Sequence, residues 1–430
     1  MIKNLCIEQL FGRFNYNIAL KPNGITIITG PNGFGKSTIL KIIDALSKGK
    51  IQYFIGLDFS KIEITFDKTK TVLQRTDSDI LIDGKSILFF RDNQDDYFMF
   101  ARRRGYMRRI PAGYIDMRTG KQISEDELDF DILQDDDFWD DFLSYSESVR
   151  VPKQLRELRN KLQEISSNCG EIRLISEQRL LRKEVRRTEE ARTIDVISNL
   201  PDQLKAEISK VYDEYSRVSN KLDSSYPKRL FAAKDGLGSK QEYTERLKDI
   251  NEKFKKLSEY NLVDISIIDN KNYNAAHSTA LKIYFDDFSE KYKVFQELIQ
   301  KLDLFTRVIN ERLTFKKIEI TRDEGFRIVD ENNKAKNLRL NQLSSGEKQE
   351  IVLFYDLIFN TKSELLLLID EPEISLHITW QKKFMDDLLE VSKQTKISAV
   401  VATHSPQIVS KHMDIQVDLG EMYGEQLDSM

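Results

Sequence analysis

Short runs in which apolar and polar residues alternate fill the chain up to about residue 90. They include IKNLCIEQL, NYNIAL, GITIITG, KIEITF, KTVLQR and SILFFR. A period of two is typical of strands with one buried face, so we expect a strand-rich region. The run STILKIIDAL has the longer period of a helix and predicts one helix among these strands.

A different pattern begins near residue 124, where an acidic stretch with interleaved aromatic residues leads into a helical segment. Pro152 is a plausible start for that helix. The β-like run EIRLIS then indicates a return to the strand-rich core.

From about Leu200 to Leu313, apolar residues recur three and four positions apart, which predicts at least three amphipathic helices. Their heptad-like spacing favours a short antiparallel coiled coil over an ordinary helical subdomain.

Two further patterns complete the organisation of the chain. The stretch SSYPKRLFAAKDGLGSK contains one proline and two glycines, and we expect it to form the turn between the first two helices of this region. After Leu313, the stretch KKIEITRDEGFRIVDENNKAK predicts a β-hairpin, and a regular α/β alternation follows it.

Composition and charge exclude several classes of protein for this chain. The 430 residues carry 66 Lys and Arg against 70 Asp and Glu, a net charge of −4, which excludes nucleic-acid binding by overall basic charge. Nucleic-acid binding by a local basic face, such as one formed by ARRRGYMRRI, remains possible. The apolar run from Leu365 to Ile369 is far shorter than the ~20 residues of a membrane span. No secretory signal pattern is evident at the N-terminus, and two cysteines form no disulfide framework, so we expect a cytoplasmic protein.

The segment GPNGFGKS is the first candidate for chemistry. It matches the pattern G-x-x-x-x-G-K-S between a β-branched strand and a helix, the context in which a phosphate loop occurs. Its glycines let backbone N–H groups surround phosphate oxygens, Lys36 adds a positive charge, and Ser37 offers a hydroxyl to Mg²⁺. A glycine-rich turn that binds nothing is the weaker alternative. The predicted nucleotide contacts are Gly30, Pro31, Asn32, Gly33, Phe34, Gly35, Lys36, Ser37 and Thr38.

Two later apolar strands end in polar residues. The run LLLLID predicts a central parallel strand, whose end would bring Asp370 beside the phosphate loop to hold Mg²⁺. Glu371 follows directly and can act as a general base toward water. The second strand precedes ATHSP, so His404 could contact the γ-phosphate or the attacking water.

The segment LSSGEKQ opens a predicted amphipathic helix. Its residues Ser344, Ser345, Gly346 and Glu347 can simply cap that helix. The same arrangement is also an anion-binding helix end. A protein with one phosphate loop needs a second anion site only if two subunits face each other across the nucleotide, and the sequence therefore predicts such a dimer.

Together, the motifs GPNGFGKS, LSSGEKQ, LLLLIDEPE and ATHSP resemble those of ATP-binding-cassette ATPases of the SMC, RecF and OLD type. The resemblance implies an α/β fold with a mixed phosphate-loop sheet, an antiparallel β subdomain and an inserted helical or coiled-coil domain. It also implies a head-to-tail ATP-sandwich dimer, in which Ser344 and Gly346 of one subunit contact the γ-phosphate held by Lys36 of the other.

The same resemblance assigns roles to individual residues. Lys36, Glu371 and His404 would be catalytic, with His404 as the switch histidine. Ser37, Asp370 and Gln178 would contact the metal, and Gln178 in ISEQRLL would couple the lobes. The implied domains are residues 1–123 as N-terminal lobe, 124–165 as acidic and helical insertion, 166–195 as returning core strand, 196–313 as helical insertion and 314–430 as C-terminal lobe.

The sequence departs from two relatives of this type. Transporter cassettes carry LSGGQ about 100 residues after the phosphate loop. Here the gap is about three times longer, and Ser345 and Glu347 replace Gly and Gln, so we expect no transporter motor. OLD-type nucleases continue past the switch histidine into a nuclease domain. This chain ends soon after His404, so we expect no built-in nuclease.

Three hypotheses for the biological role stay open. The phrases IDEPEISLHITWQKKFMDDLLE and ATHSPQIV are most similar to ATPases of two-gene anti-phage systems such as PARIS, with Septu as a relative. That resemblance implies a slow, homo-oligomeric ATPase that holds a separate nuclease or toxin effector and responds to a phage trigger protein. The second hypothesis is a RecF- or SMC-like DNA-repair ATPase with DNA on Arg102, Arg103 and Arg104. The third is a scaffold that binds ATP without hydrolysing it.

Overall fold

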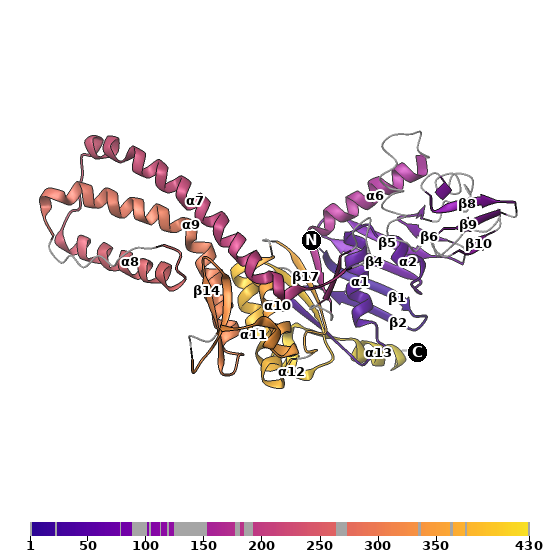
Figure 1. Ribbon diagram of the computed structural model, residues 1–430. Coiled ribbons are helices and arrows are strands. Elements are labelled where there is room, and N and C mark those ends of the chain that lie inside the picture. Colours follow the sequence, from indigo (N-terminus) through magenta and orange to yellow (C-terminus); the bar gives the residue numbers. More distant parts are fainter. Residues whose placement is uncertain are drawn as a thin grey trace. The chain divides into compact units, whose positions relative to one another are not determined.

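Figure 1 shows the computed structural model of the chain. The structure describes residues 2–21, 24–77, 79–87, 101–102, 105–111, 113–117, 120–123, 153–176, 181–184, 192–263, 273–333, 337–361, 364–374 and 376–428. Gln178, Arg103, Arg104 and the acidic stretch 124–150 lie outside these residues. The chain divides into two compact units. The first unit comprises Met1–Glu177, Lys362–Ile374 and Gln381–Met430, and the second unit comprises Gln178–Thr361 and Ser375–Trp380.

A five-stranded sheet organises the first unit. Its order is β11 (Ile172–Ile175), β17 (Leu366–Asp370), β18 (Ser398–Ala402), β3 (Ile25–Thr29) and β19 (Gln416–Asp418). Neighbouring strands pair in parallel across all four junctions. Every residue of β3, β17 and β18 is buried, as expected for strands covered on both faces. Because the strands are parallel, their carboxyl ends meet at one edge.

An antiparallel sheet of six strands forms the other β layer of the first unit. Its order is β2 (Phe14–Ala19), β1 (Ile2–Leu10), β4 (Lys61–Phe66), β5 (Lys70–Arg75), β6 (Ile80–Ile82) and β7 (Lys85–Ser86). Its strands and α1 (Lys36–Ser47) contribute to one hydrophobic core. The strands predicted from the first five runs and the predicted helix are therefore confirmed, while most of the sixth run, SILFFR, lies outside the described residues. The short helix α2 (Gln52–Ile55) was not expected.

The remaining elements of the first unit surround these sheets. A small antiparallel sheet contains β8 (Met107–Ile110), β9 (Gly113–Asp116) and β10 (Gln122–Ile123). Helix α6 (Lys153–Cys169) begins directly after Pro152, as predicted, and packs on α1. Helix α11 (Ile378–Thr395) connects β17 to β18, and α12 (Pro406–Val409) follows β18. Helix α13 (Leu419–Asp428) packs on β2 and β3.

The second unit is built around three helices, as predicted. They are α7 (Val196–Ala232), α8 (Lys240–Glu259) and α9 (Ser278–Asn310). Helix α7 packs along α9, and α8 also packs on α9 (Figure 1). The predicted hairpin is confirmed as β14 (Lys316–Thr321) and β15 (Gly325–Asp330), with β16 (Asn337–Leu338) beside β15. Strands β12 (Leu181–Glu184) and β13 (Arg192–Asp195) pair with each other, and α10 (Ser345–Phe359) packs on α7 and α9.

The predicted turn after the first of these helices begins later than expected. Helix α7 continues through Pro227 to Ala232, so only residues 233–239 separate it from α8. Proline removes one backbone donor from the helix. Nearby, the Arg229 guanidinium donates to the carbonyl oxygen of Leu222 at 2.8 Å and to Oδ2 of Asp287 on α9 at 2.7 Å. These contacts stabilise the turn around Pro227 and keep it helical.

No helix in the described part of the chain combines the length and the apolar character that crossing a bilayer requires.

Candidate functional site

The glycine-rich loop connects β3 to α1. Gly35 caps α1 with a φ of 84°, a backbone conformation that favours glycine. A Cβ atom there would lie 2.9 Å from Cδ2 of Leu10, so a side chain at this position would have to displace Leu10. The Lys36 ammonium donates to the carbonyl oxygens of Gly30 at 2.8 Å and Pro31 at 3.2 Å. Its charge therefore lies inside the loop, beside the positive end of the α1 dipole.

Residues from two other elements, β2 and α13, support this loop. The Tyr16 hydroxyl on β2 donates to the Phe34 carbonyl oxygen at 2.8 Å. The Phe34 ring packs on Phe14 and on Tyr423 of α13, with ring centroids 5.0 Å and 5.8 Å away. Asn32 and Gly33 are exposed at the tip of the loop. The contacts of Phe34 with β2 and α13 thus fix the loop, while its tip at Asn32 and Gly33 remains accessible to a ligand.

The C-terminal segment also supports the phosphate loop, which the sequence did not suggest. Oδ2 of Asp418 accepts a hydrogen bond from the Thr29 hydroxyl at 2.9 Å, directly before Gly30. Oδ1 of Asp418 accepts from the backbone N–H of Gly420 at 2.7 Å, at the start of α13. One carboxylate therefore joins the end of β3 to the beginning of α13.

Ser37 and Asp370 meet at the carboxyl edge of the parallel sheet. The Ser37 hydroxyl donates to Oδ1 of Asp370 at 2.9 Å, although the two residues are 333 positions apart. Mg²⁺ prefers oxygen ligands and usually takes only one or two from protein side chains in phosphate sites. A hydroxyl and a carboxylate side by side fit that requirement. Ser37 and Asp370, two of the three predicted metal-contacting residues, therefore lie together; the third, Gln178, lies outside the described residues.

Glu371 lies one residue beyond β17. Its backbone has a φ of 45°, which is strained for a residue other than glycine and is a feature that clusters at functional sites. Its N–H donates to the Ala402 carbonyl oxygen at 2.9 Å, and its Oε2 lies 2.5 Å from Nδ1 of His404. Burial and the neighbouring Glu373 carboxylate raise the pKa of Glu371 to about 7, while His404 opposes the rise. A carboxyl group that titrates near neutral pH is suited to general base catalysis.

Glu373 is a residue of this site that the sequence pattern did not identify. Its Oε1 accepts hydrogen bonds from the Thr403 hydroxyl at 2.5 Å, the His404 N–H at 2.9 Å and the Ser405 N–H at 3.1 Å. The residue is only 6% exposed. It fixes the turn that carries His404. The available signal was a second glutamate two positions after Glu371, within the same turn.

The ligand atoms of Glu371, Glu373 and His404 lie within 4.8 Å of one another, a spacing that could hold a metal ion. Oε1 of Glu373, however, already accepts from three protein donors. Carboxylates that position a loop in this way act through hydrogen bonds to backbone N–H groups. We therefore interpret the three residues as a hydrogen-bonded network around the Glu371 carboxyl group.

The predicted second anion site lies in the second unit, at the N-terminus of α10. Ser344 caps the helix: its hydroxyl oxygen accepts from the Glu347 N–H at 3.2 Å, and its own N–H donates to Oε2 of Glu347 at 2.8 Å. Ser344 and Ser345 are exposed, Gly346 is half-buried, and Glu347 is buried. The predicted capping arrangement is present, and the first turn of α10 is open to solvent.

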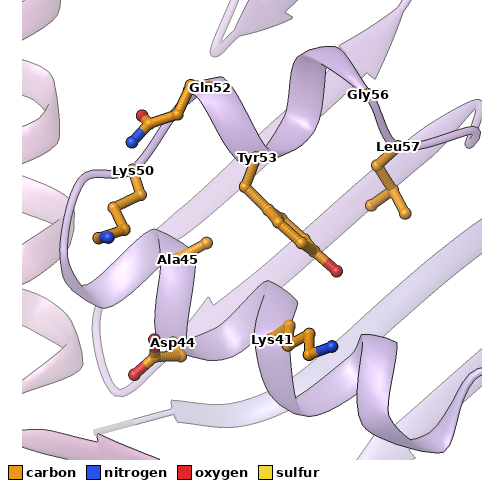
Figure 2. Close-up of a pocket in the computed structure, with 8 residues that line it drawn as sticks. All are labelled: Lys41, Asp44, Ala45, Lys50, Gln52, Tyr53, Gly56 and Leu57. Atoms are coloured by element: carbon orange, nitrogen blue, oxygen red, sulfur yellow. The ribbon is translucent and has the colours of Figure 1, made fainter. Parts of the chain in front are cut away.

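A separate cavity of about 540 Å³ lies along the C-terminal half of α1 and along α2 (Figure 2). Lys41, Lys50 and Asp44 contribute charges of both signs, and the Tyr53 ring forms part of its wall. Burial raises the pKa of Tyr53 to about 12, and its hydrogen bond to Thr38 opposes that rise. Thr38 belongs to the predicted nucleotide contacts, so the cavity wall and the first turn of α1 are joined.

The fold and the site together define a phosphate-loop nucleotide-binding protein: a loop between β3 and α1 with an internal lysine, and a carboxylate from a neighbouring parallel strand beside the following serine. Residues 1–409 match the AAA ATPase domain family, and the chain belongs to that family.

Relatives with shorter matches are ATP-binding proteins of transport systems. The lipoprotein-releasing system ATP-binding protein LolD of Leptospira interrogans serogroup Icterohaemorrhagiae serovar Lai is 36% identical over 75 residues, which is 17% of this chain and 30% of that protein. A probable iron chelatin transport ATP-binding protein of Helicobacter pylori is 34% identical over 77 residues, which is 18% of this chain and 29% of that protein. The chain thus spans less than a third of the length of these curated relatives.

Among solved structures, the chain is similar to the Smc head bound to the C-winged helix domain of ScpA. The match has a TM-score of 0.37 and 12% identity and covers 97% of this chain and 93% of that one. The Smc head domain with an extended coiled coil from Pyrococcus furiosus, bound to the C-terminal domain of ScpA, matches with a TM-score of 0.36 and 14% identity. Its coverage is 97% of this chain and 92% of that chain.

Proposed function

We propose that the chain binds ATP with Mg²⁺ at the phosphate loop of the first unit and hydrolyses it. The observation that carries this proposal is the 2.9 Å contact between the Ser37 hydroxyl and the Asp370 carboxylate, which joins the loop to the end of β17. Glu371, whose pKa is raised to about 7, follows Asp370 directly. Family membership over residues 1–409 also supports the proposal.

The residues divide the reaction among them. When phosphate enters the loop, the Lys36 ammonium exchanges its two carbonyl contacts for the phosphate oxygens and neutralises their charge. Ser37 and Asp370 would hold Mg²⁺, which would supply further neutralisation of the phosphates. The Glu371 carboxylate takes a proton from the attacking water, and His404 orients that carboxylate through its 2.5 Å contact.

We further propose that ATP joins two copies of the chain head to tail. The open first turn of α10 supports this, because Ser344 and Ser345 are exposed there and the helix end attracts anions. In such a dimer, Ser344 and Gly346 of one copy bind the γ-phosphate held by Lys36 of the other.

Mixing two inactive variants tests this arrangement. Lys36→Ala removes the phosphate-loop lysine, and Ser344→Arg blocks the helix end. A mixed dimer contains one composite site with neither change, so random pairing of equal amounts should restore about a quarter of the normal phosphate release. Each variant alone stays inactive. If the mixture is as inactive as its parts, the head-to-tail arrangement is wrong.

For the biological role, we propose an oligomeric sensor or scaffold in bacterial anti-phage defence that holds a separate nuclease or toxin effector and releases it. The similarity of IDEPEISLHITWQKKFMDDLLE and ATHSPQIV to such ATPases supports this proposal. The test is mass spectrometry of proteins that co-purify with a tagged Glu371→Gln variant from its native host, in ATP at physiological salt. A stoichiometric nuclease or toxin supports it, and a purified complex that contains no second polypeptide contradicts it.

A DNA-binding repair ATPase is the second candidate, and one observation favours it. Arg102, Arg108 and Arg109 are exposed in and near β8. If they contact DNA phosphates, affinity should fall steeply as salt rises, and Arg108→Ser with Arg109→Ser should reduce that salt dependence. Absent or salt-independent DNA binding contradicts this candidate.

A further inference from the structure

Glu347 places a negative charge at the helix end that the proposed dimer needs for phosphate. Its Oε2 accepts from the Ser344 N–H at 2.8 Å, within the first turn of α10. Burial opposes ionisation of this carboxyl group, but the Lys316 ammonium and the Ser344 N–H outweigh burial and lower the pKa of Glu347. Glu347 is therefore ionised at neutral pH. An uncompensated carboxylate here would repel the γ-phosphate of a partner.

Lys316 provides the compensating charge. It begins β14, and its ammonium lies 2.9 Å and 2.8 Å from the two carboxylate oxygens of Glu347. The side chain of Glu347 is 9% exposed and that of Lys316 is 25% exposed. The pair sits at the surface of α10 with its carboxylate covered and its ammonium partly open. Its net charge is zero only while both partners are present.

A second ion pair lies one turn further along α10. It attaches the helix to the rest of the unit, whereas the pair of Lys316 and Glu347 lies at the helix end. Nε of Arg312 lies 3.1 Å from Oε2 of Glu350, and both side chains are almost fully buried, at 2% and 3% exposed. The Arg312 guanidinium also lies 4.6 Å from the centroid of the Phe354 ring. This deeper pair fixes α10 against the segment before β14. Arg312 therefore provides a second ion pair to α10 besides that of Lys316.

We propose that Lys316 is a positioning residue of the ATP-dependent dimer, which neutralises Glu347 so that the first turn of α10 can receive the partner's γ-phosphate. The inference rests on the proposed head-to-tail dimer and extends it. Like charges at an interface oppose association, so the loss of Lys316 should weaken the dimer without changing nucleotide binding at Lys36 in the same chain.

The test compares four variants in a Glu371→Gln background, so that ATP is not consumed. They are Lys316→Met, Glu347→Gln, the combination of both, and Lys317→Met as control. Lys317 is the matched control because it is the next residue of β14 and pairs with Glu331 at 2.9 Å on the surface. The measurements are the dimer dissociation constant in Mg²⁺ and ATP by analytical ultracentrifugation, binding of a fluorescent ATP analogue, and thermal unfolding.

We expect Lys316→Met to weaken the dimer about 10-fold or more, as an unpaired charge beside a phosphate should, while Lys317→Met changes it less than about twofold. Binding of the ATP analogue, measured at protein concentrations at which the chain is monomeric, should be the same in all variants. The decisive result is rescue: in the combined variant the carboxylate is gone, so the dimer should regain its normal strength. Glu347→Gln alone leaves the Lys316 ammonium unpaired beside the phosphate, so its dimer should be at least as strong as that of the combined variant, a comparison that holds even if Lys316→Met alone folds poorly.

Two outcomes would overturn the inference alone: Lys316→Met dimerises as well as Lys317→Met, or the combined variant stays as weak as Lys316→Met. The second result would mean that Lys316 acts through packing rather than charge. If the Glu371→Gln parent binds the ATP analogue but never dimerises, the proposed head-to-tail dimer is wrong, and the inference is overturned together with it.

Discussion

The two candidate phosphate-binding segments are built in opposite ways. The phosphate loop depends on partners far along the chain: Ser37 contacts Asp370 across 333 positions, and Thr29 contacts Asp418 across 389. The helix end of α10 depends on near neighbours, with Ser344 and Glu347 three positions apart and Lys316 31 positions from Glu347. The first site requires the whole first unit, whereas the second is a local motif that presents a helix end.

The difference indicates which site can act alone. The phosphate loop gathers a lysine, a serine and two acidic residues in one unit, so we expect it to hold a nucleotide by itself. The α10 segment contributes a capped helix end with a balanced charge, which we expect to complete a site formed elsewhere. Variants in the first region should therefore abolish binding or chemistry, and variants in the second should affect association or stability.

The largest effect is expected for Lys36→Ala. It removes the buried ammonium from the loop, so ATP binding should be lost while the fold remains. Isothermal titration with ATP and Mg²⁺ measures the loss, and circular dichroism checks the fold. Lys41→Ala, on the same helix but in the wall of the separate cavity, is the control and should bind ATP normally. Normal binding by Lys36→Ala would contradict the assignment of the loop.

Glu371→Gln should reduce phosphate release about 100-fold or more, because it removes the general base, while ATP binding is kept. Steady-state phosphate release and nucleotide binding, measured on the same sample, separate the two effects. Hydrolysis at the normal rate would mean that another group activates water. If the unmodified protein shows no measurable phosphate release, the result would instead favour the hypothesis of a scaffold that binds ATP without hydrolysing it.

In the second unit, Glu350→Ala should lower the free energy of unfolding by about 3 kcal/mol or more, because it leaves Arg312 buried without its carboxylate partner. Urea unfolding measures this change. Glu331→Ala, which breaks the exposed pair with Lys317, should have little effect. ATP binding at Lys36 should survive both changes. Equal stability of the two variants would contradict the distinction between the deep and the surface ion pair.

The smallest expected effect is a shift in pH dependence. Since the pKa of Glu371 is raised to about 7, the base is protonated below that pH, and phosphate release should rise as pH increases through 7. In Glu373→Gln the amide oxygen can still accept the three hydrogen bonds, but the neighbouring negative charge is gone. The midpoint should therefore move to lower pH. An unchanged midpoint would mean that Glu373 does not influence the base.

Local patterns sufficed for β1 to β5, the three long helices and the cap at Ser344, because each depends on residues close in sequence. The turn expected within SSYPKRLFAAKDGLGSK is present but begins only at residue 233, after Pro227, where Arg229 bonds to Leu222 and to Asp287 on α9. Glu373, Lys316 and Asp418 could not be identified in advance. Each acts through a contact that exists only after distant segments have packed, and no spacing rule encodes such a contact.

The position of β3 has a consequence for how the protein is made. This strand, at residues 25–29, lies between β18 at residues 398–402 and β19 at residues 416–418. During synthesis, β3 therefore emerges well before β18 and β19, the two strands that pair with it. An apolar strand without its neighbours is prone to aggregate during synthesis. Because β19 pairs with β3 beside the phosphate loop, we expect full nucleotide binding only in chains synthesised at least to residue 418.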